Sequence, residues 1–369
     1  MKFFINKSDL LNALQKLSKV APQRSTLPIL SCVLFKIENN IIQLKATDLE
    51  QTIIINISTK CSENGTFAIP VKKLIDITQE IQDNKINFLI GSDSKIEIIT
   101  KTGSYKIMGK EANEFPETPI IEQPEKLNIK YNELKNIIND TLYAVSKDDM
   151  KISLQGVCLS INNKTITAVA TDGFRLVKRI SKTIDTKGLS DSVIIPSKFL
   201  SIINTHVSNE ENINILLGTN HIQFENNDII ILSRIIKEKY PDYESIIPTD
   251  NDKKIELNRD DLLSAVKRVS IFSNRTTRQV TLNFENNMVT IDTEDAEHMT
   301  AGNESVSCKY EKEPISIGFN ANFLKELLSN QPTTKIIIKL KTSLGAGMFY
   351  PIDEKENIDI VTLLMPIRI

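Results

Sequence analysis

Three short patterns recur along this chain, each at intervals of about 125 residues. The first is a strand pattern that runs into a helix pattern, with aligned leucines at Leu10, Leu134 and Leu262. The second is an apolar strand that meets another helix at Pro70, Pro196 and Asn320. The third is an apolar residue followed by proline, at Phe115-Pro116, Tyr240-Pro241 and Met365-Pro366. A period of this length matches a domain, so the sequence predicts three similar domains in tandem.

Each predicted domain holds two helices among several short strands, so the fold class is α+β, with two helices plus antiparallel sheets in each domain. Apolar and β-branched runs predict strands at 53–57, 96–100, 229–232 and 335–340. A strand followed by a helix starts each domain and recurs about 60 residues later, which indicates a doubled half-unit. We place Pro70 and Pro196 in the first turn of the second helix, where a missing N–H has no cost.

Proline-rich connectors at 116–124 and 241–248 predict linkers between the domains. The predicted domains are residues 1–121, 127–245 and 246–369. Three similar domains in a row suggest an arc. An arc that pairs with a second copy can close into a ring of six domains.

Positive charge is concentrated in six predicted helical windows, although the whole chain carries a net charge of −2. The windows are residues 7–24, 70–82, 130–147, 196–207, 258–275 and 320–330. In that order they carry +3, 0, +1, +1, +2 and 0, a total of +7 that leaves −9 for the rest of the chain. Basic helices on an acidic protein suit a ring whose inner wall attracts phosphate. The alternative is an ordinary solvated helix face.

No catalytic or metal-binding constellation is recognisable in the sequence. The cysteines and histidines lack metal-ligand spacing; they are Cys32, Cys61, Cys158 and Cys308, and His206, His221 and His298. No phosphate-binding loop is present either. We therefore expect no enzyme activity, no cofactor and no metal. The chain also lacks an apolar run long enough for a membrane span and lacks a secretion signal, so we expect a cytoplasmic protein.

The triplet Ala-Thr-Asp begins at residues 46 and 170, one repeat apart. Its carboxylates, Asp48 and Asp172, follow predicted strands, where aspartate commonly forms turns. A pair of catalytic acids is the less favoured alternative.

Several stretches at matching positions resemble the beta subunit of bacterial DNA polymerase III, the sliding-clamp family. They are residues 26–30 (TLPIL), 46–50 (ATDLE), 170–176 (ATDGFRL), 240–243 (YPDY), 317–320 (IGFN) and 364–368 (LMPIR). The resemblance covers all three domains. It implies a head-to-tail homodimer that forms a six-domain ring, with twelve helices around the hole and no catalytic activity. It also implies that the ring tethers polymerase to double-stranded DNA without sequence preference.

The resemblance further implies a pocket between the second and third domains for short motifs of the polymerase alpha subunit, the clamp loader and other partners. The matching positions are Leu154, Thr171, Gly173, Phe174, Arg175, Leu176, Pro241, Ile246, Phe323, Leu363, Met365, Pro366, Ile367 and Arg368. The tail residues can equally form a plain final strand, and both interpretations can hold together. Ser245 stands where some members have arginine, so peptide selectivity is expected to differ.

The implied DNA-contact residues are Arg24, Lys72, Lys147, Lys151 and Lys198. Ile152-Ser153 replaces the aromatic residues of some members, which argues against base stacking there. The implied dimer seam contains Lys73, Tyr105, Ile271 and Phe272, although an Ile-Phe pair at a helix end could also belong to the core.

Two other functions stay open at this point. One is a peptide-docking scaffold that forms no ring. The other is an enzyme with a site near Asp172 and Arg175, which the absence of a nucleophile or metal set makes the weakest hypothesis.

Overall fold

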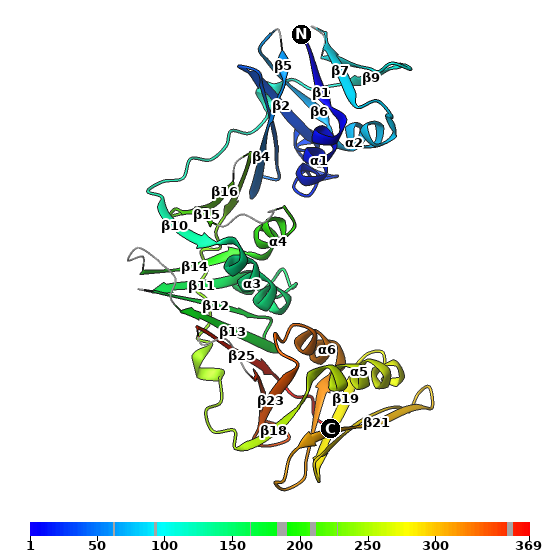
Figure 1. Ribbon diagram of the computed structural model, residues 1–369, viewed down its shortest axis with the longest axis vertical. Helices are drawn as coiled ribbons and strands as arrows, with labels where there is room; N and C mark the ends of the chain where they lie inside the picture. Colours follow the sequence, from blue (N-terminus) through cyan, green and yellow to red (C-terminus); the bar gives the residue numbers. More distant parts are fainter. Residues whose placement is uncertain are drawn as a thin grey trace. The chain divides into compact units, whose positions relative to one another are not determined.

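A computed structural model of the chain describes residues 1–369 except 62, 92–93, 163, 183–189, 207–211, 227 and 353–356. One order of elements occurs three times: a strand, a helix and three strands, followed by the same five elements again (Figure 1). This order agrees with the expected doubled half-unit. It also places two α-helices in each repeat.

The first repeat begins with β1 (Lys2–Asn6), α1 (Lys7–Leu17), β2 (Cys32–Glu38), β3 (Ile41–Thr47) and β4 (Gln51–Ser58). Its second half comprises β6 (Gly65–Pro70), α2 (Val71–Glu80), β7 (Lys85–Ile90), β8 (Lys95–Ile99) and β9 (Ser104–Met108). Short additions are the strand β5 (Lys60–Cys61) and the 3-10 turns η1 (Pro28–Ser31) and η2 (Ala112–Glu114).

The second repeat begins with β10 (Glu125–Lys130), α3 (Tyr131–Thr141), β11 (Gly156–Asn162), β12 (Thr165–Thr171) and β13 (Arg175–Lys182). The 3-10 turns η3 (Leu142–Ala144) and η4 (Ile152–Leu154) follow α3. Its second half comprises β14 (Ser190–Pro196), α4 (Ser197–His206), β15 (Asn212–Leu217), β16 (His221–Asn226) and β17 (Ile229–Arg234).

The third repeat follows the turn η5 (Glu244–Ile246) and begins with β18 (Lys253–Asn258), α5 (Arg259–Val269), β19 (Gln279–Glu285), β20 (Met288–Asp295) and β21 (Thr300–Lys309). The turn η6 (Ser270–Phe272) extends α5. The second half comprises β22 (Ile315–Asn320), α6 (Ala321–Ser329), β23 (Lys335–Leu340), β24 (Gly347–Pro351) and β25 (Ile358–Leu364).

The described chain forms two compact units, which divide the second repeat between them. One unit contains Met1–Tyr131 and Lys198–Ile235, and the other contains Asn132–Ser197 and Ile236–Ile369. In the first unit, β17 pairs with β4, so an eight-stranded sheet joins the first and second repeats. In the second unit, β13 pairs with β25, so a twelve-stranded sheet joins the second and third repeats. The sheets therefore continue from one repeat to the next.

Each sheet buries the apolar side of its alternating strands against helices. In the first unit, α1 packs against α2, and the buried rings of Phe3, Phe35, Phe67 and Phe88 contact one another. In the second unit, α5 packs against α6 over a core that includes Phe284, Phe319 and Phe349. None of the helices in the described ranges is long and apolar enough to cross a membrane.

The helices are shorter than the windows used to count charge, and this changes the charge assignment. From α1 to α6 they carry +1, 0, −1, +1, +1 and 0, a total of +2. The other positive residues of the windows lie in flanking segments: Lys19, Arg24, Lys130, Lys147 and Arg275. The helices therefore remain net positive, at +2 against −4 for the rest of the chain, but most of the net charge counted in the windows lies outside them.

The proline positions also need a correction. Pro70 and Pro196 are the last residues of β6 and β14, and the helices α2 and α4 begin one residue later. The prolines therefore stand just outside the first helical turn. Their fixed φ suits the extended backbone at this boundary.

A buried ion cluster attaches α3 to β13 inside the second unit. The guanidinium of Arg179 is 2% exposed and donates hydrogen bonds to Glu133, at 2.8 Å, and to Asp140. Both carboxylates belong to α3, and Ser181 also donates to Glu133. Burial raises the pKa of Asp140 to about 6, although Arg179 lowers it in part. The cluster therefore holds one cation against two carboxylates.

The raised pKa of Asp140 predicts a pH-dependent stability. A carboxyl whose pKa is higher in the folded state stabilises the fold below its unfolded pKa, and this contribution is lost as the pH rises through about 6. Relative to the Asp140→Asn variant, the wild-type protein should lose about 2–3 kcal/mol between about pH 4 and 7. Urea titrations of both proteins across this range measure the difference. A difference that is constant with pH contradicts the prediction.

Candidate partner-binding site

The same turn occurs once in each repeat, at the end of the second of the three strands that follow the first helix. These strands are β3, β12 and β20. Oδ1 of Asp48 accepts hydrogen bonds from the backbone N–H groups of the second and third residues after it, at 3.1 and 2.6 Å. Asp172 does the same at 2.9 and 3.0 Å, and Asp295 at 3.1 and 3.4 Å. The turn interpretation of Asp48 and Asp172 is therefore confirmed. The turn at Asp295 was not predicted from the sequence, because Ala-Thr does not precede this aspartate.

In the second repeat this turn positions Gly173 and Phe174. Thr171 is buried and donates to the carbonyl oxygen of Arg175 at 2.6 Å, while its Oγ1 accepts from the N–H of Gly173 at 3.1 Å. Gly173 has a φ of +93°, in the region that glycine enters without strain. The chain therefore reverses tightly, and the Phe174 side chain remains exposed.

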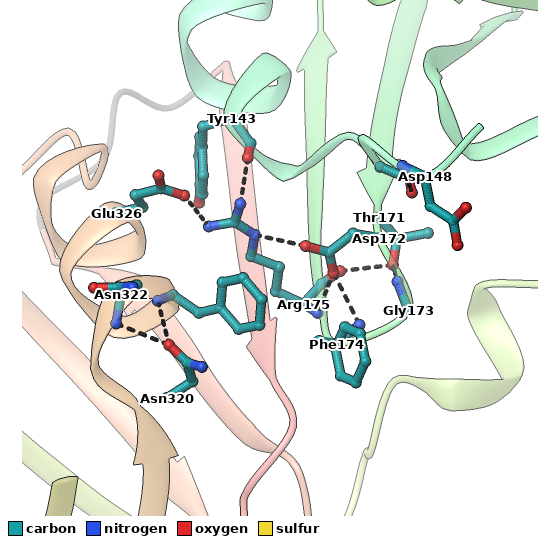
Figure 2. Close-up of polar contacts among 12 residues, drawn as sticks. Tyr143, Asp148, Thr171, Asp172, Gly173, Phe174, Arg175, Asn320, Asn322 and Glu326 are labelled. Atoms are coloured by element: carbon teal, nitrogen blue, oxygen red, sulfur yellow. Dashed lines mark hydrogen bonds and ion pairs between the residues drawn. The ribbon is translucent and has the colours of Figure 1, made fainter. Parts of the chain in front are cut away.

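The guanidinium of Arg175 lies at the centre of this region (Figure 2). Its Nε donates to Oδ2 of Asp172 at 3.1 Å, Nη1 to Oε2 of Glu326 at 2.5 Å, and Nη2 to the carbonyl oxygen of Tyr143 at 2.6 Å. It also lies over the ring of Phe323, 4.7 Å from the ring centre. Arg175 thus links the turn, η3 and helix α6 of the third repeat.

Phe174 and Phe323 form an aromatic pair contributed by two repeats. Their ring centres are 5.9 Å apart with an angle of 23° between the planes. The ammonium of Lys151 lies 5.5 Å from the Phe174 ring centre and donates to the carbonyl oxygen of Asp172 at 3.2 Å. Lys151, which the resemblance assigns to DNA, therefore contacts the predicted peptide site.

The C-terminal tail closes one side of the same region. The N–H of Met365 donates to the carbonyl oxygen of Phe174 at 2.8 Å, and that of Ile367 to the carbonyl oxygen of Gly318 at 2.8 Å. Met365 is exposed, Pro366 and Ile367 are half-buried, and Arg368 is exposed. The tail thus continues from β25 as a strand-like segment and also lies beside Phe174.

The remaining predicted pocket residues divide into buried and accessible sets. Leu176 and Leu363 are fully buried in a small apolar cluster with Cys158, Val169 and Met348. Pro241 and Ile246 are exposed on the connector, and Leu154 is half-buried in η4. Sequence reasoning did not assign Tyr143 and Glu326 to the site, because only the fold brings η3 and α6 to Arg175.

The predicted DNA-contact residues have different surroundings. Arg24 and Lys147 are exposed in segments that follow α1 and η3, and Lys72 is exposed on α2. Lys198 is the second residue of α4 and pairs with Asp48 of its own unit. An ion pair at a surface of this kind contributes little to stability.

The predicted seam residues are all at the surface of the single chain. Lys73 is exposed on α2, Tyr105 is exposed on β9, and Ile271 and Phe272 are exposed on η6. Ile271 is 77% exposed, so the Ile-Phe pair is not part of the core of this chain.

One acidic and histidine cluster was missed by the spacing argument. Asp295, Glu297 and His298 bring three possible ligand atoms within 4.8 Å of one another. Nδ1 of His298 is 2.9 Å from Oδ2 of Asp295, and Asp295 also accepts the turn hydrogen bonds. The hydrogen bonds of the turn bring these three side chains together.

Comparisons with known proteins identify all three repeats. Models of the DNA polymerase III beta subunit match residues 1–119 with the N-terminal domain, 128–242 with the central domain and 244–368 with the C-terminal domain. The beta sliding clamp of Pseudomonas aeruginosa is 29% identical over 374 residues, covering 100% of both proteins. That of Chlamydia pneumoniae is 26% identical over 369 residues, covering 100% of this chain and 99% of the relative.

Solved structures give the same result. A crystal structure of the sliding clamp from Pseudomonas aeruginosa bound to griselimycin is 27% identical with a TM-score of 0.92, covering 100% of both chains. The clamp of Bacillus subtilis, at 23% identity, has the same fold with a TM-score of 0.94 over 100% of this chain and 99% of that one. The chain therefore belongs to the DNA polymerase III beta subunit family, the non-catalytic sliding clamps of DNA replication, and consists of three tandem α+β clamp domains with two helices each.

Proposed function

We propose that two copies of this protein pair head to tail into a six-domain ring that encircles double-stranded DNA and tethers the replicative polymerase. The observation that carries the proposal is the match of three consecutive clamp domains over almost the whole chain. The proposed domains are residues 1–121, 127–245 and 246–369. Binding is sequence-independent, and the work is done in the cytoplasm, where a bacterial chromosome lies.

Two exposed strand edges support the pairing. Among the described residues, β9 pairs with β8 alone and so ends the five-stranded sheet. β21 pairs along its length with β20, but with β18 only at Cys308 and Lys309, which leaves residues 300–306 with one open side. Open edges of this kind are usually covered. One edge lies in the first repeat and one in the third, as a head-to-tail contact requires.

Apolar side chains lie beside both edges. Tyr105 and Met108 are exposed on β9, and Ile271 and Phe272 are exposed on η6. Thr300, at the start of β21, donates to the carbonyl oxygen of Phe272 at 3.2 Å, so η6 and the open edge are adjacent. We propose that Lys73, Tyr105, Ile271 and Phe272 meet at the seam between copies.

We further propose that the aromatic pair and the tail form the accessible part of the partner-binding pocket. Phe174, Phe323 and Met365 offer apolar surface, and Leu176 and Leu363 belong to a buried apolar cluster of the same unit. The partners are short apolar and acidic motifs of the polymerase alpha subunit, the clamp loader and other clamp-binding proteins. The proposed DNA contacts are Arg24, Lys72, Lys147, Lys151 and Lys198. Of these, Lys151 also lies beside the proposed pocket.

Griselimycin, which is bound in the structures of relatives from Pseudomonas aeruginosa and Bartonella birtlesii, provides a probe for this pocket. We expect the Phe174→Ala variant to bind it about 10-fold more weakly, because losing the apolar surface that a ligand would bury on this exposed ring costs about 1.4 kcal/mol of binding free energy. Isothermal titration calorimetry measures the change. The Ile120→Ala variant, which alters an exposed apolar residue of the first unit, should bind like the wild-type protein. Equal affinity in all three proteins contradicts this location for the pocket.

A further inference from the structure

The resemblance places Arg175 among the residues that bind partner peptides, but its guanidinium is already occupied within the protein. The side chain is 5% exposed, and Nε, Nη1 and Nη2 each donate a hydrogen bond to a group of this chain. The planar group also lies over the rings of Phe323 and Tyr143, at 4.7 and 5.4 Å from their centres. These contacts use three of the five N–H donors, and the low exposure of the side chain leaves little of the guanidinium accessible to a ligand.

We propose that Arg175 is a positioning residue that sets the aromatic wall of the pocket and does not itself contact the partner. This inference rests on the proposed partner-binding function and assigns a different role to one of its residues. The wall consists of Phe174 and Phe323, and Arg175 is bonded to the elements that carry both.

Arg175 fixes the Phe174 side of the wall through Asp172. Oδ1 of Asp172 accepts from the N–H groups of Phe174 and Arg175, and its Oδ2 accepts from Nε of Arg175 (Figure 2). The carboxylate is therefore held by both the turn and the guanidinium. If the guanidinium is lost, Oδ2 loses this partner and the turn that presents Phe174 loses its support.

Arg175 fixes the Phe323 side through helix α6. Phe323 lies in the first turn of this helix, where Asn320 accepts hydrogen bonds from the N–H groups of Asn322 and Phe323. One turn further on, Glu326 pairs with Nη1 of Arg175. The guanidinium thus contacts the helix at the carboxylate of Glu326 and at the ring of Phe323, which fixes the rotation of α6 relative to the turn.

The two rings belong to different domains, so their separation depends on such cross-domain contacts. A wall that is already assembled before the partner arrives spares the partner the cost of ordering it. Loss of the guanidinium geometry should therefore weaken binding even where charge is kept. Lysine keeps the charge but lacks the planar fork that serves several acceptors at once.

The chain contains no tryptophan, which makes a specific optical readout possible. A Phe174→Trp substitution introduces a single indole at the wall, so the fluorescence of the ligand-free protein reports on this position alone. Affinity for griselimycin is measured separately in proteins that keep Phe174. The variants are Arg175→Lys and Glu326→Gln. The control is Asp359→Asn, which breaks a surface ion pair with Lys182 that also joins the second and third repeats.

We expect Arg175→Lys to weaken griselimycin binding at least 10-fold and to shift the indole emission of the ligand-free protein toward that of an exposed indole. The Glu326 side chain is half exposed, so this position tolerates substitution. Glu326→Gln should weaken griselimycin binding about 3-fold and shift the indole emission in the same direction as Arg175→Lys. Asp359→Asn should change neither. If Arg175→Lys fails to fold, as judged by circular dichroism, the Glu326→Gln variant decides the question.

Two results overturn the proposal. If affinity falls while the emission of the ligand-free protein is unchanged, Arg175 acts on the ligand directly. If neither readout changes in Glu326→Gln, the cross-domain pair does not set the wall. Failure of the wild-type protein to bind griselimycin would count against the proposed pocket. The emission of the ligand-free variants would still test whether Arg175 positions the aromatic wall.

Discussion

Replacing Arg179 with alanine will lower the free energy of unfolding of the second unit by about 3–5 kcal/mol at neutral pH. The substitution removes the cation from between Glu133 and Asp140, whose carboxylates are 23% and 15% exposed. Two like charges then face each other with little access to water. Because burial already raises the pKa of Asp140 to about 6, the loss should be smaller near about pH 4, where this carboxyl is neutral.

Urea titrations of the wild-type and variant proteins at both pH values measure this loss. The neighbouring Lys178→Ala substitution provides the control, because Lys178 forms an ion pair with the exposed Glu244 and its loss should cost less than about 1 kcal/mol. Combining Arg179→Met with Glu133→Gln and Asp140→Asn removes all three charges and should recover much of the stability. A cost for Arg179→Ala no larger than that of Lys178→Ala would show that the cluster is not stabilising.

Wild-type protein loaded on a nicked circular duplex will stay with the DNA during gel filtration and will be released when the circle is cut. A closed ring holds the circle without neutralising many phosphates at once. Retention on circles should therefore depend only weakly on salt. Ile271→Asp combined with Phe272→Asp places two charges at the proposed seam. We expect this variant to be monomeric by native mass spectrometry and its retention to fall at least 10-fold, since each buried apolar side chain contributes about 1.5–3 kcal/mol.

The Ile120→Asp variant, which alters an exposed apolar residue of the connector before β10, should dimerise and be retained normally. A wild-type protein that is monomeric, or that leaves circular and linear DNA at the same rate, would favour the peptide-docking scaffold over the ring. Steep salt dependence with a sequence preference would also count against encirclement.

The repeat architecture was predictable from sequence because its markers are local. Alternating strands, helix starts and apolar-proline pairs are each encoded within a few residues, and their common interval disclosed the three domains. The exact ends of the helices were less predictable. Lys19 and Arg24 lie in a polar segment that a helical window absorbs, although α1 has already ended at Leu17. The windows therefore counted as helical some positive residues that lie just outside the helices.

The candidate site was predictable only through residues that carry a recognisable motif. The stretch from Thr171 to Leu176 is such a motif, so its members were named in advance. Glu326 has no motif, and 151 positions separate it from Arg175 in the chain. The contact forms because the fold joins the two domains, with β13 paired to β25. Likewise, nothing in the sequence indicated that Lys151 lies on Phe174.

The continuity of the sheets has a practical consequence for fragments of this protein. In the central domain, β17 pairs with β4 of the first domain, and β13 pairs with β25 of the third. Expressed by itself, it would present both strands uncovered and would be prone to aggregate. A stable fragment should therefore include the partner strand from the neighbouring domain. A fragment that ends at a proline-rich connector would lack it.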